Sequence, residues 1–366
     1  MRALARVNLA AIERNVARLR RELTGGTELC AVVKADGYGH GATPAATAAL
    51  AGGATWLAVA AAGEAAALRA DGIDARLLVM GALTSSELDI ALRADADVVA
   101  WREELLSAIA DRGGGRVHVK LDTGMGRLGT RDPAEATSVA EAAATTAGVQ
   151  LAGAMSHFAT ADEPGDAFLG EQLERFRAWA LPLRERFPGV VLHAANSAAV
   201  LRDAATHFDL VRPGVAIYGL DPFQQDAAAQ ELEPALELAS YVAEVKPCAA
   251  GQSAGYGRRF VAERDTVLAT LPIGYGDGVR RALTNNAEVR IGGRRLPLVG
   301  TVSMDNVTVD LGPDGGGVHR GDEALLIAPG LPAEEMARRL QTINYEITCG
   351  LTARVARHYH RDGAPP

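Results

Sequence analysis

"AVVKADGYGH", residues 31–40, places a lysine directly after a run of small apolar residues and before a glycine-rich loop. Residues 29–35 are apolar up to this lysine, which is typical of a strand buried on both faces of a parallel sheet. A lysine at such a strand end is usually ion-paired or extends to solvent. A desolvated lysine instead has a lowered pKa and is suited to Schiff-base chemistry. The fold around Lys34 therefore decides which of the two roles applies.

Seven more apolar segments of strand length follow along the chain, at residues 56–60, 76–80, 98–101, 117–121, 151–157, 190–194 and 208–211. Segments rich in Ala, Leu, Glu and Arg, with the spacing of amphipathic helices, lie between them. Eight strands that each lead into a crossover indicate an α/β fold of the (β/α)8 TIM-barrel type. A doubly wound open sheet is the alternative, but it usually has a glycine-rich first turn, which is missing here. We predict that residues 1–230 form the barrel.

The pattern changes after about residue 230. Short alternating segments such as "YVAEVKP" (241–247) and "VSMDNVTVDLG" (302–312) are separated by Gly, Asn and Pro, which is typical of a β-rich domain. The segment "RIGGRR" (290–295) predicts a hairpin turn. We predict a C-terminal β-strand domain over residues 231–366, with residues 1–10 as candidates to pair with it.

Composition argues against several functional classes. The net charge is −8 and no stripe of Lys and Arg is present, which argues against a nucleic-acid partner. Three widely separated cysteines, Cys30, Cys248 and Cys349, indicate a reducing compartment and no zinc site. No apolar run is long enough to span a bilayer and no signal segment is visible. We therefore expect no membrane association and a cytoplasmic location.

Catalytic residues of a barrel lie at the C-terminal ends of its strands. Five cationic or hydrogen-bonding residues follow predicted strands here, namely Lys34, Arg127, His157, Ser197 and Arg212. No carboxylate cluster with metal-ligand spacing accompanies them, so we predict an anion-binding pocket and no metal. In "VRPGVAIYG" (211–219) the backbone N–H groups of Gly214 and Val215 lie beside an arginine and form a candidate phosphate cradle. A Schiff-base lysine together with a phosphate cradle points to pyridoxal 5′-phosphate (PLP).

A series of longer motifs resembles those of the alanine racemases, a family of barrel-type PLP enzymes. In the order of that family the chain carries "AVVKADGYGHG", "KLDTGMGRLG", "MSHFATADE", "NSAA", "VRPGVAIYG", "SAGYGRRF", "LPIGYGDG", "VSMDN" and "RVARHY". The resemblance implies a homodimer with shared active sites that racemises alanine with PLP held by Lys34. It also implies that Lys34 acts on one face of the substrate Cα and that Tyr256 of the second subunit acts on the other. Racemisation needs such a pair, because a proton leaves one face and returns to the other.

The resemblance assigns roles to further residues. His157 matches a histidine that hydrogen-bonds the tyrosine, and Arg212 matches an arginine facing the pyridine nitrogen, where a guanidinium keeps its proton. Arg127 and the backbone N–H of Met304 match the contacts of the substrate carboxylate. Lys120 matches a lysine that some members carry as a carbamate, with a plain ion pair as the alternative. The remaining matches bind the cofactor, at Tyr38, Asn196, Ser197, Gly214, Val215 and Tyr359, or lie beside Met304 or in the substrate access channel, at Asp305, Tyr275, Asp162 and Arg281.

Thr301 is the main departure from the family pattern, since an arginine usually follows the glycine of "VGTVSMD". Loss of this charge leads to the hypothesis of a wider access channel and of activity on serine or another small amino acid. Two other PLP classes fit less well, because barrel decarboxylases need a catalytic cysteine in the second domain and PLP-carrier proteins lack that domain. We expect a racemase that supplies D-alanine for peptidoglycan, with a biosynthetic or inhibitor-resistance role left open.

Overall fold

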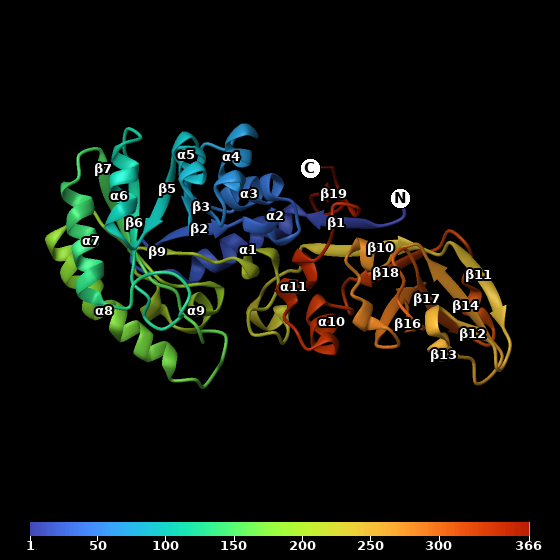
Figure 1. The fold of residues 1–366 in the computed structure, drawn as a ribbon. Helices are drawn as coiled ribbons and strands as arrows, with labels where there is room; N and C mark the ends of the chain where they lie inside the picture. Colours follow the sequence, from blue (N-terminus) through green and yellow to red (C-terminus); the bar gives the residue numbers. More distant parts are fainter. Residues whose placement is uncertain (366) are drawn as a thin grey trace.

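The computed structural model describes residues 1–365 and consists of a barrel and a sheet domain placed side by side (Figure 1). Eight parallel strands form the barrel, in the order β8-β7-β6-β5-β4-β3-β2-β9. Their bounds are β2 Glu28–Val32, β3 Trp56–Val59, β4 Arg76–Val79, β5 Ala96–Ala100, β6 Gly115–Lys120, β7 Val149–Met155, β8 Val191–His193 and β9 Leu210–Val211. Each overlaps one of the predicted strands, so the barrel prediction is confirmed.

Backbone hydrogen bonds bring the two ends of this sheet together. The Arg212 amide donates to the Ala195 carbonyl (2.9 Å) and the Asp209 amide donates to the Leu192 carbonyl (3.0 Å), which links β8 with the β9 segment. The sheet is therefore a nearly closed barrel. Helices cover its outer face (Figure 1), at α3 Ala42–Ala51, α4 Ala62–Ala70, α5 Ser85–Arg93, α6 Glu103–Ala110, α7 Pro133–Thr145, α8 Phe168–Arg186 and α9 Ser197–Arg202.

Local sequence signals fix where the outer helices begin. Asp132 and Asn196 cap α7 and α9, and each side chain accepts an amide hydrogen bond from the first turn (2.8 and 3.0 Å). Pro133 occupies the start of α7, where no amide donor is needed. Because the barrel strands all pair parallel, their C-terminal ends share one face of the barrel. That face carries most of the predicted site residues.

The C-terminal domain is built on a nine-stranded sheet, in the order β11-β14-β17-β16-β15-β18-β10-β1-β19. The N-terminal strand β1 (Leu4–Asn8) belongs to it, pairing antiparallel with β10 and parallel with β19. The other strands are β10 Leu236–Tyr241, β11 Glu244–Cys248, β14 Thr266–Leu271, β15 Ala287–Ile291, β16 Arg294–Val299, β17 Val307–Gly312, β18 Glu323–Ile327 and β19 Ala356–His360. A separate hairpin of β12 (Ser253–Ala254) and β13 (Phe260–Val261) lies at the end of this domain away from the barrel (Figure 1).

The segment "RIGGRR" forms the predicted hairpin between β15 and β16. Gly292 and Gly293 are its two loop residues, because Ile291 pairs directly with Arg294. Both glycines have positive φ, 56° and 78°, as a type I′ turn requires. The turn prediction is confirmed.

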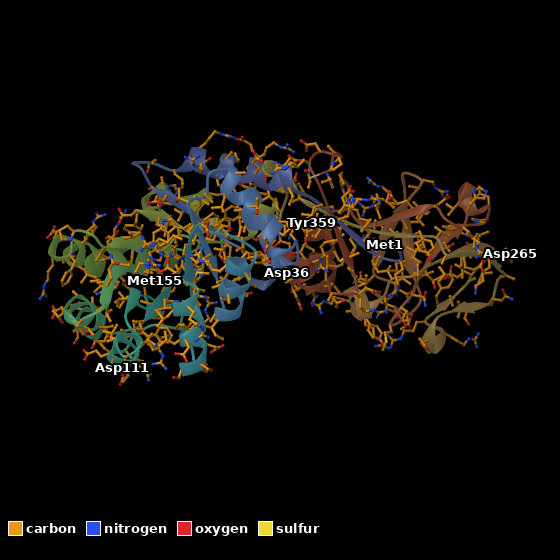
Figure 2. All side chains as sticks on the ribbon, turned by 90° about the horizontal axis from the view of Figure 1, so that it is seen from above. Met1, Asp36, Asp111, Met155, Asp265 and Tyr359 are labelled. Carbon is orange, nitrogen blue, oxygen red and sulfur yellow. The ribbon has the colours of Figure 1, made fainter. Side chains whose placement is uncertain are left out.

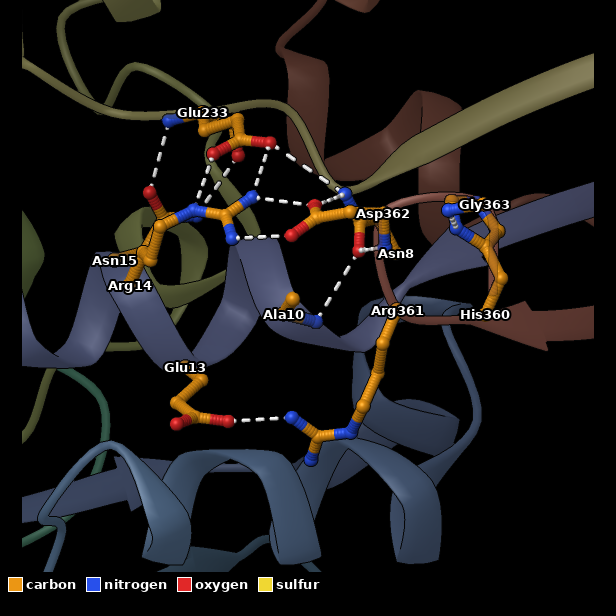
Figure 3. Close-up of polar contacts among 10 residues, drawn as sticks. All are labelled: Asn8, Ala10, Glu13, Arg14, Asn15, Glu233, His360, Arg361, Asp362 and Gly363. Atoms are coloured by element: carbon orange, nitrogen blue, oxygen red, sulfur yellow. Dashed lines mark hydrogen bonds and ion pairs between the residues drawn. The ribbon is translucent and has the colours of Figure 1, made fainter. Parts of the chain in front are cut away.

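Ion pairs and hydrogen bonds hold helix α1 (Leu9–Glu22) against the C-terminal segment (Figure 3). Arg14 donates to Glu233 (2.8 and 2.9 Å) and to Asp362 (2.8 and 2.9 Å). Arg361 donates to Glu13 on the same helix (2.6 Å). Glu233 precedes β10 and Asp362 follows β19, so these contacts fix the sheet domain relative to the barrel.

Helices α10 (Ala333–Leu340) and α11 (Asn344–Cys349) lie between the two parts of the molecule (Figure 1). Helix α11 contacts the segment that begins at Lys34, so the C-terminal domain reaches the barrel mouth there. Within residues 1–365, no helix has the length and apolar character that crossing a bilayer requires.

Candidate active site

Lys34 begins a tight turn instead of ending a strand, which corrects the predicted strand over residues 29–35. Strand β2 ends before it, and Lys34–Tyr38 forms the one-turn segment α2. Ala35, Asp36 and Tyr38 have positive φ, 52°, 53° and 54°. A left-handed conformation costs a non-glycine residue about 1–2 kcal/mol, so it forms only where other contacts impose it.

Carboxylates impose this turn. Glu64, near the start of α4, accepts the amide hydrogen of Ala35 (2.6 Å) through one oxygen. Its other oxygen accepts the amide hydrogens of Ala60 and Ala61 (2.9 and 3.0 Å). Asp36 accepts the amide hydrogen at the start of α3 (2.9 Å). These charge-assisted hydrogen bonds offset the backbone strain and hold the segment after Lys34 in one conformation.

His40 lies buried beneath the turn. Its Nδ1–H donates to the carbonyl oxygens of Gly37 and Tyr38, both at 3.1 Å, and its ring stacks on Tyr218 with 4.5 Å between centroids. Burial lowers the pKa of His40 to about 4. The ring is therefore neutral at physiological pH and supports the turn as a hydrogen-bond donor.

The lowered pKa of His40 predicts a loss of stability in acid. In the unfolded chain a histidine binds a proton below about pH 6.5, whereas folded His40 binds one only below pH 4. The contribution of neutral His40 to the free energy of unfolding is therefore fully present above about pH 6.5 and is lost as the pH drops toward 4. His40→Asn keeps an N–H donor and does not titrate. Between pH 7 and pH 5 the free energy of unfolding of the cofactor-free protein, measured in urea, should fall by about 2 kcal/mol more in the wild type than in this variant. The same pH dependence of the free energy of unfolding in the wild type and in His40→Asn would contradict a neutral, buried His40.

Four cations from three strand ends lie close enough to influence one another's charge, and we call this cluster the cationic pocket: Lys34 after β2, Lys120 at the end of β6 with Arg127 in the following loop, and Arg212 after β9. Burial, then Arg127 and Arg212, lowers the pKa of Lys34. Burial, then the same two arginines, lowers the pKa of Lys120 to about 8. Within residues 1–365 none of the four forms an ion pair with a carboxylate. The two nearby carboxylates, Glu64 and Asp122, offset only part of this positive charge, so the cationic pocket fits an anionic ligand.

Arg212 lies at the end of a buried chain of hydrogen bonds. It is 3% exposed, and its Nη1–H donates to His193 Nδ1 (2.5 Å). Because a guanidinium can only donate, His193 must carry its own proton on Nε2. That proton is donated to His118 Nδ1 (2.7 Å), and His118 Nε2–H is donated to Asp97 (2.9 Å). The chain fixes both tautomers and holds the Arg212 guanidinium in one orientation.

The charges along this chain are set by burial and by hydrogen bonding. Burial lowers the pKa of His118 and, more strongly, that of His193, so both rings are neutral. Burial opposes ionisation of Asp97, but hydrogen bonds from His118 and two arginines outweigh it and hold the pKa of this carboxyl well below its usual range. Burial lowers the pKa of Arg212 to about 10, which still leaves the guanidinium protonated at neutral pH.

His157 lies beside Arg212 at the end of β7. The Arg212 Nη2 is 3.5 Å from His157 Nδ1 and donates to the Ser156 carbonyl at 2.8 Å. Burial and the surrounding cations, Arg212 foremost, lower the pKa of His157 well below its usual value. A neutral His157 presents one hydrogen-bond donor and one acceptor.

Two phenols close the other side of the barrel mouth. A Cβ atom on Gly214 would lie 2.2 Å from the Tyr38 hydroxyl, and one on Gly41 would lie 2.0 Å from the Tyr359 hydroxyl. Only glycine leaves room for the phenol at either position. Figure 2 shows Asp36, in the turn that carries Tyr38, and Tyr359 near the junction of the barrel and the sheet domain.

Ser197 arranges the backbone donors of the β9 loop. Its Oγ accepts the amide hydrogens of Gly214 (2.9 Å) and Ala216 (3.3 Å), which leaves its O–H available as a donor. The Gly214 amide is therefore not free, contrary to expectation. The Val215 amide begins the short helix η2 (Val215–Tyr218) and has no acceptor within it. Asn196 caps α9 and so places Ser197 at that helix's first position.

Tyr256 lies on the C-terminal domain, far from the barrel pocket of the same chain. It occupies the turn between β12 and β13, and 74% of it is exposed. That hairpin is separated from the barrel by the rest of the sheet domain (Figure 1). Within one chain the structure does not bring Tyr256 to Lys34.

Met304 and Tyr275 are exposed on two neighbouring loops of the sheet domain. The Tyr275 amide donates to the Ser303 carbonyl (3.0 Å), and the Gly276 amide donates to the Met304 carbonyl (2.9 Å). These two backbone contacts tie the loops together, so the predicted substrate-binding Met304 and the predicted channel residue Tyr275 share one surface.

A buried carboxylate that the sequence pattern did not single out fixes the same loops. Asp277 is 0% exposed and accepts hydrogen bonds from Arg2 (3.0 and 3.1 Å) and from the Gly274 amide (2.9 Å). Arg2 also donates to the Asp305 carbonyl (3.1 Å), and Arg354 donates to the Asp305 carboxylate (2.6 Å). The N-terminal segment thereby holds the loop that presents Met304.

The wider access channel expected from Thr301 stays a prediction, and the residue itself is largely buried. It is 7% exposed, and its hydroxyl donates to the backbone carbonyl of Tyr256 (2.6 Å). The other two predicted channel residues, Asp162 on the barrel and Arg281 on the sheet domain, are exposed. At the position where the family usually has an arginine, this chain therefore has a hydroxyl bonded to the Tyr256 backbone.

Both domains match known protein families. Residues 7–222 match the family model "Alanine racemase, N-terminal domain", and residues 235–359 match "Alanine racemase, C-terminal domain". The chain belongs to the alanine racemase family. The alanine racemases of Symbiobacterium thermophilum and Mycobacterium tuberculosis are 42% and 44% identical to it, over 97% and 98% of this chain and 96% of each relative. A crystal structure of alanine racemase from D-cycloserine-producing Streptomyces lavendulae has 38% identity and a TM-score of 0.92, over 98% of this chain and 97% of that one.

Membership of the alanine racemase family makes the chain an isomerase and confirms the family expected from its motifs. The buried residues His118, His193 and Asp97 were nevertheless missed at the sequence level. One signal was present, because "RVHVK" places His118 two residues before Lys120 and so on the same face of the strand. Tyr345 of α11 was also missed, although its ring centroid lies 6.0 Å from that of Tyr38.

Proposed function

We propose that this racemase interconverts L- and D-alanine with PLP bound covalently at Lys34. In this proposal Lys34 exchanges the Cα proton on one face, and Tyr256 of the partner subunit exchanges it on the other. The observation that carries the proposal is the cluster of four cations, none of which forms an ion pair with a carboxylate within residues 1–365. A phosphate and a substrate carboxylate together supply the missing negative charge.

The pocket residues fit PLP by their chemistry. Phosphate oxygens need donors, and the Ser197 O–H and the Val215 amide are available for them. The Gly214 backbone lies against the hydroxyl of Tyr38, and the Gly41 backbone against that of Tyr359, where the same phosphate group would be held. Asn196 acts as the cap that positions Ser197. When bound, PLP supplies an electron sink that acidifies the Cα–H bond.

Lys34 is suited to act as a base because its pKa is lowered. Burial and the nearby Arg127 and Arg212 favour the neutral amine, so a larger fraction is ready to accept a proton at neutral pH. The strained turn that follows Lys34 keeps its backbone in place. On the opposite face the Tyr256 phenol donates or accepts the proton, and neutral His157 serves as its hydrogen-bond partner.

Arg212 favours racemisation over transamination because its guanidinium keeps its proton. Its donor-only guanidinium is fixed by His193 and would hold the pyridine nitrogen of PLP without transferring a proton to it. An unprotonated ring draws less electron density from the substrate than a pyridinium does. Reprotonation at Cα is therefore favoured over transamination.

Arg127 and the Met304 amide bind the substrate carboxylate in this proposal. Lys120 supports Arg127 as a carbamate: its pKa of about 8 leaves part of the amine neutral and able to take up CO2. The alternative, a plain ion pair at Lys120, is not formed within residues 1–365, because the nearby Asp122 carboxylate accepts hydrogen bonds from Gly124, Gly126 and Arg131 instead. Tyr275, Asp305, Asp162 and Arg281 surround the route to this carboxylate site.

A homodimer follows from the position of Tyr256. Its side chain is exposed, and the β12–β13 hairpin that carries it lies at the end of the molecule away from the barrel (Figure 1), so we infer that another copy brings it to a Lys34 site. We further propose that the enzyme acts in the cytoplasm and supplies D-alanine for peptidoglycan.

Optical rotation tests this function. Purified protein loaded with PLP should be yellow and should carry both L-alanine and D-alanine to zero rotation without loss of amino acid. L-serine, measured in parallel, tests the hypothesis that Thr301 widens the access channel, and racemisation of alanine alone at a useful rate would contradict that hypothesis. Release of CO2 in place of racemisation would indicate a decarboxylase, and unchanged rotation of alanine by yellow protein would refute the proposal.

A further inference from the structure

The carbonyl of Tyr256 has a single side-chain partner, the hydroxyl of Thr301, although the Tyr256 side chain is exposed. The Thr301 Oγ1–H donates to the Tyr256 carbonyl oxygen at 2.6 Å. Tyr256 is 74% exposed and Thr301 is 7% exposed. The Tyr256 phenol is thus exposed to solvent, while the Tyr256 backbone is hydrogen-bonded to the buried Thr301.

The turn that carries Tyr256 has little regular structure to hold it. Its flanking strands β12 and β13 have two residues each and pair only with one another. Gly255, Gly257 and Arg258 all have positive φ, at 74°, 69° and 50°. A short turn of this kind opens easily unless its backbone is bonded to a more rigid element.

Thr301 belongs to such an element. The amide of Gly300 donates to Asn285 (2.5 Å) and the amide of Val302 donates to Thr284 (3.1 Å), so the backbone is fixed on both sides of Thr301. Contact with the turn is close, since a Cβ on Gly255 would lie 3.0 Å from the Thr301 nitrogen. Packing and the hydroxyl hydrogen bond therefore act at the same point.

We propose that Thr301 is a positioning residue for Tyr256, an inference that rests on the proposed role of Tyr256 as the second acid–base group. The hydroxyl fixes the Tyr256 carbonyl and thereby sets where the phenol stands when it enters the partner subunit's pocket. A displacement of about 1 Å at a catalytic group can cost about 100-fold in rate. Loss of this hydrogen bond should therefore lower kcat without removing the phenol itself.

Two substitutions separate the hydrogen bond from the packing. Thr301→Val keeps the shape of the side chain and removes the donor, whereas Thr301→Ser keeps the donor and removes a methyl group. We expect Thr301→Val to lower kcat about 10-fold with KM for alanine unchanged, and Thr301→Ser to stay within about 2-fold of wild type. Thr308→Val, in strand β17 of the same domain, is the matched control and should behave as wild type.

Amide hydrogen exchange of the dimer supplies a readout independent of catalysis. Residues 253–261 should exchange faster in Thr301→Val than in wild type, Thr301→Ser and Thr308→Val, both with and without PLP. Unchanged exchange in Thr301→Val would overturn the inference, as would equal rate losses in Thr301→Val and Thr301→Ser, which would show that packing alone matters.

Tyr256→Phe, measured in parallel, distinguishes the positioning role of Thr301 from the acid–base role of Tyr256. A strong rate loss in Tyr256→Phe with a normal rate in Thr301→Val would overturn only the positioning role. Full activity of Tyr256→Phe would overturn the proposed function of Tyr256, and the positioning role of Thr301 with it.

Discussion

Lys34→Ala should reduce racemisation of alanine by at least about 10⁴-fold and remove covalently bound PLP. The substitution deletes both the cofactor anchor and one of the two acid–base groups, while the cationic pocket keeps Lys120, Arg127 and Arg212. PLP should therefore still bind, but reversibly, and should be lost on gel filtration. Absorbance before and after borohydride reduction measures this directly.

The chain allows a clean control, because it contains only three lysines, Lys34, Lys120 and Lys246. Lys246 is exposed on β11, and Lys246→Ala should leave both activity and reducible PLP unchanged. Mass spectrometry of the reduced wild type should find the PLP adduct on Lys34. An adduct on Lys120, or an active Lys34→Ala enzyme, would contradict the assignment.

Tyr256→Phe should lower the racemisation rate by about 10²–10⁴-fold, since it removes one proton-transfer group and leaves the other. The cofactor linkage at Lys34 should remain, so the absorbance of the bound cofactor should not change. Exchange of the Cα proton with deuterated solvent should persist for the enantiomer whose proton faces Lys34 and be lost for the other. This asymmetry separates a missing base from a misfolded protein.

Tyr241→Phe is the matched control for this variant. Tyr241 is also exposed on the C-terminal domain, on β10, and has no predicted role. Its substitution should leave racemisation and solvent exchange at wild-type levels for both enantiomers. Equal losses of exchange for L- and D-alanine in Tyr256→Phe would argue against two opposed groups.

The barrel could be predicted because each of its strands and helices is determined by a short segment of sequence. Each buried strand of the barrel is a short apolar run, and each outer helix has its own spacing. In the sheet domain, Gly292-Gly293 likewise determines the β15–β16 turn without help from distant residues. The family motifs added the candidate residues, which lie on the barrel mouth and on the sheet domain as two separate groups. Their separation follows from the domain arrangement, which no single motif contains.

The errors share a physical cause, namely contacts between distant segments. Apolar periodicity extended the first strand through Lys34, but Glu64 from the next βα unit draws the chain into a left-handed turn. The hydrogen bond from the Thr301 hydroxyl to the Tyr256 carbonyl, 45 residues earlier, is likewise a contact that the motif did not predict. The histidines behind Arg212 were missed because their role depends on three strands meeting inside the barrel.

The central claim is that one active site takes Lys34 from one subunit and Tyr256 from the other, and a mixed dimer tests it. A heterodimer of Lys34→Ala and Tyr256→Phe subunits, isolated with two affinity tags, contains one wild-type site and one site with both substitutions. We predict about half the wild-type activity per dimer from two nearly inactive parents. A heterodimer no more active than its parents would contradict the shared site.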